Sequence, residues 1–384
     1  KTLTEIYIVS TENARTLYAT LGNLNLAEGA GLSPELASAY ADMSAVCPLL
    51  NLHSLAEKYR SLAAQAAQAL GMEPVTAYVR MSTSVFTVGQ GRWEESADSL
   101  DRAIAAFRQL GDWNRLGLTL VLRTHVHIFK GEFEAFQAVH RDIADLAERS
   151  GSFQHMIWAR DGEAESMLRL AGADRLQDVV ARLQQNLAAM DRAGFELEQA
   201  HVHSLLVQAH LRRGDWAAAR QAGDDGARII ARSSPTFYSQ LEGYAGPAHA
   251  YLGCWQMASD ASEAKVLSKQ ALAACRKLRK FAGIFPVARP RSMRLEGMYK
   301  WLSGNRRGAI QTWEAGIELA RRLGMRYEEA LTHLELLRRL EPGAASRPVH
   351  LAQAGSLLRQ LPAAYELAEL KHWSDGEPEF PLTT

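Results

Sequence analysis

Histidine is the residue type whose spacing in this sequence comes nearest to a metal site. Two His-Val-His triplets place His125 close to His127 and His201 close to His203. On a helix, residues two apart point about 200° away from each other, so the two rings of a triplet do not share a metal ion. His203 and His210 lie on one helical face but lack a third ligand nearby. We therefore expect core or surface histidines and predict no metal site.

The motifs of common catalytic sites are also missing from the sequence. It contains no GxxxxGK[ST], HExxH or GxSxG motif, and no GxGxxG motif after a strand, because no segment has a strand pattern. Carboxylate pairs such as Glu94/Glu95 and Asp224/Asp225 fall in helical segments, where we expect them to be solvated. We predict a chain that is not an enzyme and has no cofactor. A site formed by residues from several repeats remains open at this stage.

Positive charge is concentrated in one stretch. Between Arg276 and Arg307, ten basic residues stand against one acid, Glu296. The whole chain has 43 Lys+Arg and 43 Asp+Glu, so the remainder carries a net charge of −9. The stretch is either a docking surface for an acidic partner or a phosphate group, or an ordinary solvated face with a loop. Our candidate partner-binding residues are Arg289, Arg291, Arg294 and Lys300.

Two interleaved series of glycines recur about every 40 residues. The segments between them, such as 92–110 and 305–323, have apolar residues three or four apart, which is typical of amphipathic helices. Glycine is the usual residue for the left-handed position that ends a helix. We therefore predict that one series ends the first helix of each pair and the other series ends the second. The first series is Gly91, Gly131, Gly172, Gly214, Gly253 and Gly304, and the second is Gly31, Gly71, Gly111, Gly151 and Gly194.

An aromatic residue follows several glycines of the first series by two positions. We expect these side chains, at the start of the second helix, to wedge against the partner helix across the short turn. The adhesion-like tripeptide Arg213-Gly214-Asp215 occupies the same place in its repeat, so we expect Asp215 to begin a helix rather than to mark a recognition loop. The aromatic residues are Trp93, Phe133, Trp216 and Trp255.

The repeats predict an all-α fold. A helix pair alone does not bury its apolar stripe, whereas stacked pairs share a continuous core. We predict a right-handed superhelix of about nine antiparallel helix pairs over residues 1–362, similar to tetratricopeptide repeats but with a period near 40, and a loose tail over 363–384. The expected pairs lie near 1–29, 33–71, 74–111, 112–151, 153–194, 195–233, 235–283, 286–324 and 326–362.

Composition favours a cytoplasmic protein without membrane spans. No run of about 18 apolar residues occurs, and the first residues do not form a basic and apolar leader. Cys47, Cys254 and Cys275 are far apart in the sequence, so we expect free thiols in a reducing compartment. A formal net charge of +0 argues against a nucleic-acid binder. Because residue 1 is lysine, we expect a fragment of a longer protein or a processed one.

Segments 24–46 and 285–336, with the turns between them, resemble a known region. It is the tetratricopeptide-like C-terminal region of large bacterial adenylate/guanylate cyclases, in which a class III cyclase domain and a STAND-type ATPase domain precede the helical repeats. The resemblance extends from about residue 3 to residue 340. It implies a regulatory or scaffolding role, with the chemistry in other domains. The metal aspartates of the cyclase and the phosphate loop of the ATPase have no counterpart here.

Three hypotheses about function follow. The first is a non-catalytic interaction domain whose concave face binds a protein partner or the ATPase core of its own chain. The second is a superhelix that senses a small-molecule inducer, as in ATPase-linked transcription activators. The third, a solenoid that binds nucleic acid through the basic stretch, is disfavoured by the neutral charge. Aromatic residues of an inducer pocket would include Trp158, Tyr238, Tyr244, Tyr251 and Trp301, although core positions are the more frequent place for such residues.

Overall fold

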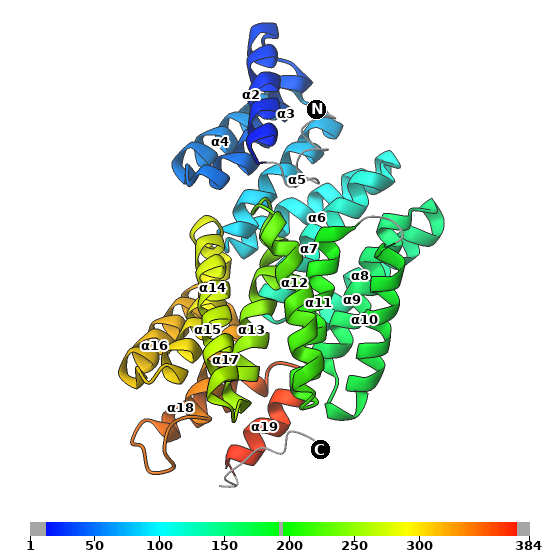
Figure 1. Cartoon of the computed structure of the whole chain (residues 1–384). Helices are drawn as coiled ribbons and strands as arrows, with labels where there is room; N and C mark the ends of the chain where they lie inside the picture. Colours follow the sequence, from blue (N-terminus) through cyan, green and yellow to red (C-terminus); the bar gives the residue numbers. More distant parts are fainter. Residues whose placement is uncertain (1–12, 192–194, 375–384) are drawn as a thin grey trace.

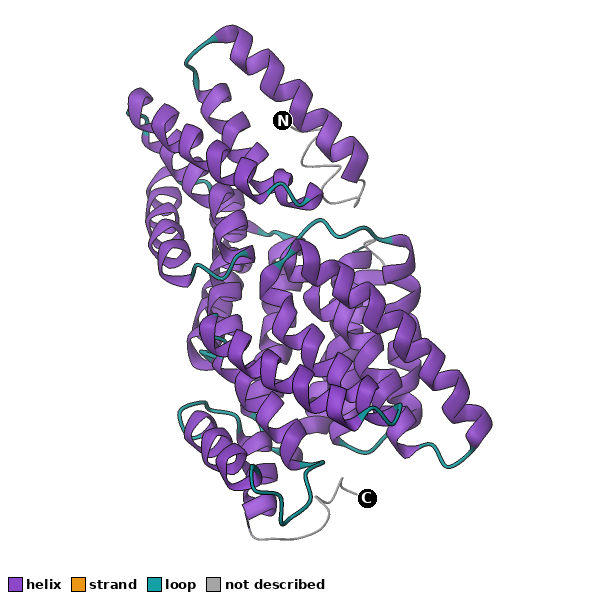
Figure 2. Ribbon diagram, turned by 90° about the vertical axis from the view of Figure 1, so that its left-hand side faces the viewer, coloured by secondary structure: helices purple, strands orange, loops and turns teal. Residues whose placement is uncertain are grey.

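The computed structural model describes residues 13–191 and 195–374. Regular structure in these residues is helical throughout, with eighteen α-helices, α2 to α19, and four short 3-10 helices (Figures 1 and 2). The α-helices are α2 Asn13–Ala30, α3 Pro34–Val46, α4 His53–Leu70, α5 Glu73–Gly89, α6 Trp93–Leu110, α7 Trp113–Lys130, α8 Phe133–Ser150, α9 Phe153–Leu170, α10 Leu176–Asp191, α11 Glu196–Arg212, α12 Trp216–Arg232, α13 Leu241–Met257, α14 Ala261–Ile284, α15 Arg289–Leu302, α16 Arg306–Arg322, α17 Arg326–Leu337, α18 Arg347–Leu358 and α19 Ala364–Ser374. The 3-10 helices are η1 Cys47–Leu50, η2 Ala173–Arg175, η3 Tyr238–Gln240 and η4 Pro286–Ala288.

Successive helices pack on one another as pairs, which confirms the predicted all-α repeat fold. The pairs α5/α6, α7/α8 and α15/α16 lie where the glycine periods place them. Two irregularities interrupt the series. Helix η1 is inserted between α3 and α4, and α14 is longer than its neighbours, with 24 residues. The first helix expected near 1–29 lies largely outside the described residues.

Glycine ends many of the helices because these positions need a positive φ. Gly91 has a φ of 78° and Gly131 a φ of 81°, values that residues with a Cβ rarely adopt. Two members of the first glycine series depart from the prediction. Gly172 is extended, and Gly253 lies inside α13, so the turn after α13 falls at Ala258–Asp260 instead. Gly194 lies outside the described residues. The other series members with positive φ are Gly31, Gly71, Gly111, Gly151, Gly214 and Gly304.

Short polar side chains cap the N-termini of several helices. Asp215 begins α12, and its Oδ1 accepts a hydrogen bond from the backbone N–H of Ala218 at 3.1 Å. This satisfies one of the N–H groups that lack a partner within the helix. Arg213-Gly214-Asp215 is therefore a helix junction. Side chains of Ser33, Asp112, Ser152, Asp260 and Asn305 cap their helices in the same way.

The two helices of a pair differ in what they contact beyond the pair. The first helices of successive pairs pack on each other, as in α3 with α5, α11 with α13 and α13 with α15. The second helices of successive pairs do not contact each other over a comparable area among the described residues. The first helices therefore lie closer together and form the inner wall of a curved array, while the second helices lie outside.

The array curves enough for distant repeats to meet. The indole N–H of Trp93, at the start of α6, donates to the carbonyl oxygen of Leu323, which lies 230 residues further along the chain. The ring of Phe133 packs edge-on against Tyr327 of α17, with ring centroids 4.9 Å apart. These two aromatic residues therefore contact repeats that are far away in the sequence. We expected each of them to pack against the partner helix of its own pair. Trp255 lies inside α13 rather than at a helix start.

The segment after α18 is not the loose tail that we predicted from residue 363. Residues Ala364–Ser374 form α19, which lies at the lower end of the molecule in Figure 1. Tyr365, Glu366 and Leu370 are buried: Tyr365 and Leu370 belong to apolar clusters with earlier helices, and Glu366 pairs with Arg212 of α11. Residues 375–384 lie outside the described residues. None of the described helices is both long and apolar enough to span a membrane.

Candidate functional site

The four predicted docking residues separate between the surface and the interior. Arg289 is exposed, and its Nε donates to the carbonyl oxygen of Ala282 at 3.2 Å. Lys300 is half-buried and pairs with Glu296 at 3.1 Å. Arg291 and Arg294 are turned inward, with side chains that are 11% and 7% exposed. The four residues therefore do not form one exposed surface, and this part of the prediction is wrong.

Arg291 and Arg294 belong instead to a set of ion pairs along the inner wall, which we call the inner network. It joins six helices from α9 to α19. The sequence does not indicate this network, because its positive and negative residues come from segments far apart in the chain. Its members are Glu165, Arg169, His201, Arg212, Glu242, Arg291, Arg294, Glu328, Glu335, Arg338, Arg339, Glu366 and Glu369.

Arg169 of α9 lies at one end of the inner network and is 2% exposed. Its guanidinium donates to Glu165 at 2.8 Å, to Gln208 at 2.7 Å and to Glu242 at 3.2 Å. A buried arginine is costly unless carboxylates and acceptors satisfy it. Because Glu242 belongs to α13, this residue ties three successive first helices together.

Arg291 of α15 continues the inner network toward the C-terminal repeats. It pairs with Glu242 of α13, and its Nε donates to Glu328 of α17 at 2.6 Å. Arg294, one turn further along α15, also contacts Glu328, at 3.3 Å. Each of these carboxylates is shared between helices, so the charges fix the relative positions of neighbouring repeats.

Helix α19 closes the inner network at the C-terminal end. Glu366 pairs with Arg212 of α11 and accepts a hydrogen bond from the hydroxyl of Tyr327 at 2.8 Å. Glu369 receives two hydrogen bonds from Arg338, of which the longer measures 2.7 Å. The contact between α11 and α19 joins residues 154 positions apart. The inner wall is therefore occupied by the chain's own helices at this end.

The electrostatics of the inner network favour the charged forms of Glu242 and His201. Burial opposes ionisation of Glu242, but Arg291 and Arg169 outweigh it and lower its pKa to about 2. Burial likewise opposes protonation of His201, yet Glu165, Glu242 and Asp161 raise its pKa to about 9. His201 is therefore a cation at neutral pH and lies 3.2 Å from the Glu165 carboxylate.

His125 and His140 pack against neighbouring aromatic rings. Burial lowers the pKa of His125 to about 4 and that of His140 to about 3, so both rings are neutral. The His140 ring lies over Gly162, where an added Cβ would approach it within about 2.0 Å. Among the described residues, no group of three or more His, Cys, Asp or Glu side chains is arranged to hold a metal ion.

The three cysteines are buried and unpaired. Burial raises the pKa of the Cys47 and Cys254 thiols to about 11, and that of Cys275 to about 12. The thiolate is the reactive form of cysteine. These thiols are therefore unsuited to nucleophilic chemistry at neutral pH.

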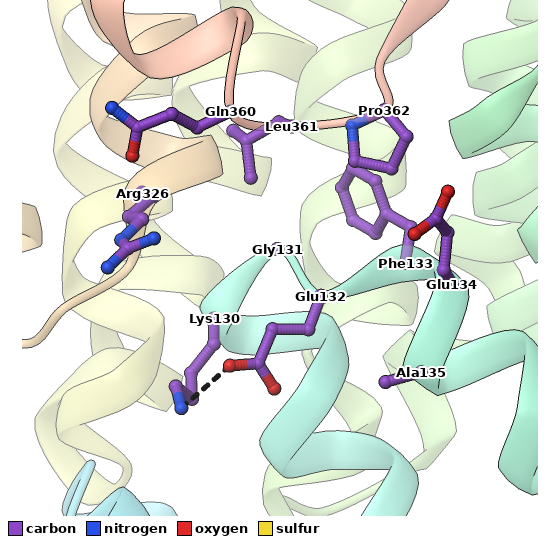
Figure 3. Close-up of a pocket in the computed structure, with 10 residues that line it drawn as sticks. All are labelled: Lys130, Gly131, Glu132, Phe133, Glu134, Ala135, Arg326, Gln360, Leu361 and Pro362. Carbon is purple, nitrogen blue, oxygen red and sulfur yellow. Dashed lines mark ion pairs between the residues drawn. The ribbon is translucent and has the colours of Figure 1, made fainter.

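A small hollow lies where the N-terminal and C-terminal repeats meet (Figure 3). It measures about 240 Å³ and is lined by the turn between α7 and α8, by Arg326 and by the segment Gln360–Pro362. Lys130 is one of its lining residues and pairs with Glu132 at 2.7 Å. Binding pockets for drug-sized ligands measure about 300–1,000 Å³. The hollow is below that range.

The aromatic residues considered for an inducer pocket are core residues. Tyr238, Tyr244 and Tyr251 are buried within the largest apolar cluster, and Trp158 and Trp301 pack against it. The Tyr244 ring stacks on Phe281 with centroids 4.6 Å apart. These rings fill the space between helices and therefore do not line a cavity.

Several exposed residues of the basic stretch lie on α14, while Arg289, Arg306 and Arg307 are exposed on other elements. Arg276, Lys277 and Lys280 are exposed on α14, together with Lys265 and Lys269 earlier in the helix. Arg279, on the same helix, pairs with Glu296 of α15 at 3.3 Å. The sequence indicated the C-terminal half of this surface through its charge density. It did not indicate Lys265 and Lys269, because they precede the run of basic residues.

The helix pairs and the inner network define the class of protein as an all-helical repeat protein whose repeats are joined by buried ion pairs. No known family model matches the chain, and no curated protein matches it either.

Proposed function

We propose that this chain is a non-catalytic interaction and regulatory module, which binds a protein partner or other domains of its own polypeptide. The observation that carries the proposal is the inner network. Its buried charges pair with one another across α9 to α19, and this arrangement fixes the repeats as a scaffold. A scaffold of that kind holds its surfaces in a defined geometry, which is the property that a docking module needs.

From the resemblance to the C-terminal region of bacterial cyclases, we propose that this module belongs to a larger signalling protein. We propose a cytoplasmic parent with a STAND-type ATPase domain and a nucleotide cyclase domain, whose output the repeats restrain or release. The location is inferred from the free cysteines and from that resemblance.

The second candidate function, sensing of a small-molecule inducer, has less support. The hollow in Figure 3 is small, and Glu132 already neutralises Lys130 within it. Only Arg326 and Gln360 remain there as polar groups that extend from other repeats. An inducer would need a further opening of the repeats around this site.

The proposal is tested in the cell that makes the protein, by two measurements. Chemical cross-linking with the isolated chain as bait identifies bound proteins, and extraction of the same sample identifies bound small molecules. In parallel, the region encoding these residues is deleted from the parent gene, and the nucleotide product is measured. We expect a stoichiometric protein partner, or a several-fold change in product. The proposal would be contradicted if both results were absent, or if a metabolite were bound without any protein.

A further inference from the structure

Helix α14 carries an exposed positive face that the rest of the structure does not neutralise. None of its cations other than Arg279 makes an ion pair with a residue in the part of the chain that the structure describes. The single acid of the helix, Glu263, already pairs with Arg220 of α12 at 3.0 Å. The cations without such a pair are Lys265, Lys269, Arg276, Lys277 and Lys280.

The spacing of these residues makes a continuous stripe. At about 100° per residue, Lys265, Lys269, Arg276 and Lys280 lie within an arc of about 60° on the helix surface. They extend over about 22 Å along the axis, at 1.5 Å per residue. Four positive charges therefore form one line along the outer side of the array.

A second feature of the same face is apolar. Val266, 46% exposed, and Ala273 lie beside the stripe, within about 100° of Lys265 on the helix surface. Lys277 lies on the far side of these two residues. The face thus has a small apolar strip with cations on both sides, an arrangement that suits an amphipathic acidic segment.

On another outer helix, α6, charged side chains form ion pairs. On α6, Asp98 pairs with Arg102 at 3.0 Å, and Arg108 pairs with Asp142 of α8 at 2.8 Å. The α14 stripe instead places like charges four residues apart, as in Lys265 and Lys269, which disfavours the isolated helix. Carboxylates supplied from outside would remove that repulsion.

We propose that the outer face of α14 is the docking surface of this module, and that its partner is an acidic, amphipathic protein helix. The inference rests on the proposed interaction function and names the surface and the chemistry of the partner. Carboxylates at the spacing of the stripe pair with Lys265, Lys269, Arg276 and Lys280, and an apolar side chain covers Val266 and Ala273.

A protein segment suits this face better than a nucleic acid does. The whole chain has a formal net charge of +0, so it lacks the general positive charge that attracts an extended phosphate backbone. The exposed Val266 contributes to binding only where the ligand brings an apolar group to it. A helix of about 20 residues covers the stripe and ends there.

The test measures binding of a synthetic peptide to the full chain by fluorescence anisotropy. The peptide is a labelled helix of about 20 residues with glutamate at the spacing of the stripe and leucine between. A second peptide has glutamine in place of glutamate. A single-stranded oligonucleotide and a duplex of about 20 nucleotides serve as phosphate probes. We expect binding of the glutamate peptide that weakens as salt rises, and weaker binding of the other three.

Two variants with the same change in net charge locate the surface. The first reverses the stripe: Lys265→Glu, Lys269→Glu, Arg276→Glu and Lys280→Glu. The second reverses four exposed cations on other outer elements: Arg232→Glu, Arg307→Glu, Arg322→Glu and Arg359→Glu. We expect at least a tenfold loss of affinity for the first variant and less than a threefold loss for the second. Circular dichroism checks that both remain folded.

Three results would overturn the inference: equal losses in both variants, tighter binding of an oligonucleotide than of the peptide, or no binding of the glutamate peptide at all. These results are separate from a failure of the proposed function. If the peptide does not bind but cross-linking captures a stoichiometric protein, the interaction function stands and the assignment of the surface is wrong.

Discussion

The inner network and the outer face of α14 both carry a high density of positive charge. The positive charges of the inner network are paired with carboxylates, whereas those of the α14 stripe are not paired within the described part of the chain. At the inner wall, Arg169 and Arg291 each pair with two carboxylates, and at least one of the two comes from another helix. On α14, Lys269 and Lys280 are exposed and have no such carboxylate among the described residues. The difference separates charges that build the scaffold from charges that are free to bind, although Arg291 and Lys280 are close in the sequence.

Charge density in the sequence does not distinguish exposed cations from cations that lie at the inner wall. Within the basic stretch, Lys280 and Arg291 are only eleven residues apart. One lies on the outer helix of a pair and the other on the inner helix of the next pair. Composition does not distinguish the two positions, whereas the curvature of the array does.

The sharpest test of this difference is charge reversal in each region. In Arg291→Glu, the new carboxylate lies between Glu242 and Glu328, where the pairing charge is lost. Removing one partner of a buried pair costs about 3–5 kcal/mol, and repulsion adds to that cost. We expect a free energy of unfolding lower by at least that amount in urea titrations. Lys280→Glu, the matched change on α14, is expected to leave the unfolding midpoint unchanged; equal effects would abolish the distinction.

A pH titration tests whether the inner network is charged as described. The folded-state pKa of His201 is raised to about 9 from 6.5. Its contribution to stability is therefore fully present below pH 6.5 and is lost as pH rises through about 9. We expect the wild type to lose up to about 3 kcal/mol more than His201→Gln over this window.

His203→Gln is the control for this titration. The pKa of His203 is lowered from 6.5, chiefly by burial, so its neutral form is favoured and its contribution changes at lower pH. Its loss of stability between pH 6.5 and 9 should follow the wild type. A His201 variant that also follows the wild type would show that Glu165 does not hold a charged imidazole.

Close packing between inner and outer helices gives an intermediate effect. In Gly162→Ala, the new Cβ of α9 meets the His140 ring of α8 at about 2.0 Å, so the helices must separate. Overpacking of this kind costs about 1–3 kcal/mol. Gly283→Ala, near the end of α14, has no atom within 4 Å of the new Cβ. We expect a lower melting temperature for the first variant and none or a small rise for the second; the reverse order would place the tight contact elsewhere.

The smallest expected effect is a gain in stability on α14 itself. Lys269→Glu replaces a like-charge pair with an opposite-charge pair, Lys265 with Glu four residues on. Such pairs contribute about 0.2–0.5 kcal/mol on exposed helices. We expect a slightly higher urea midpoint together with weaker binding of the acidic peptide. A loss of stability would mean that Lys269 already has a structural partner.

Much of the helix pattern was predictable because it depends on local chemistry. Gly91, Gly131 and Gly304 lie at turns since positive φ is a property of glycine itself, and Asp215 caps α12 through its own side chain. The docking residues were not predictable in the same way. Arg291 and Arg289 are two residues apart and have similar side chains, yet one is buried among carboxylates and the other is exposed.

The sequence by itself determined the all-helical repeat, the position of most turns and the absence of the common catalytic motifs. These follow from periodicity and from backbone preferences that act over a few residues. Only the tertiary structure decided that Trp93 reaches Leu323, that α19 docks through Glu366, and that Arg291 belongs to the inner network. These contacts depend on how far the array curves. Curvature is a sum of small rotations at every helix interface, so no single segment of the sequence encodes it.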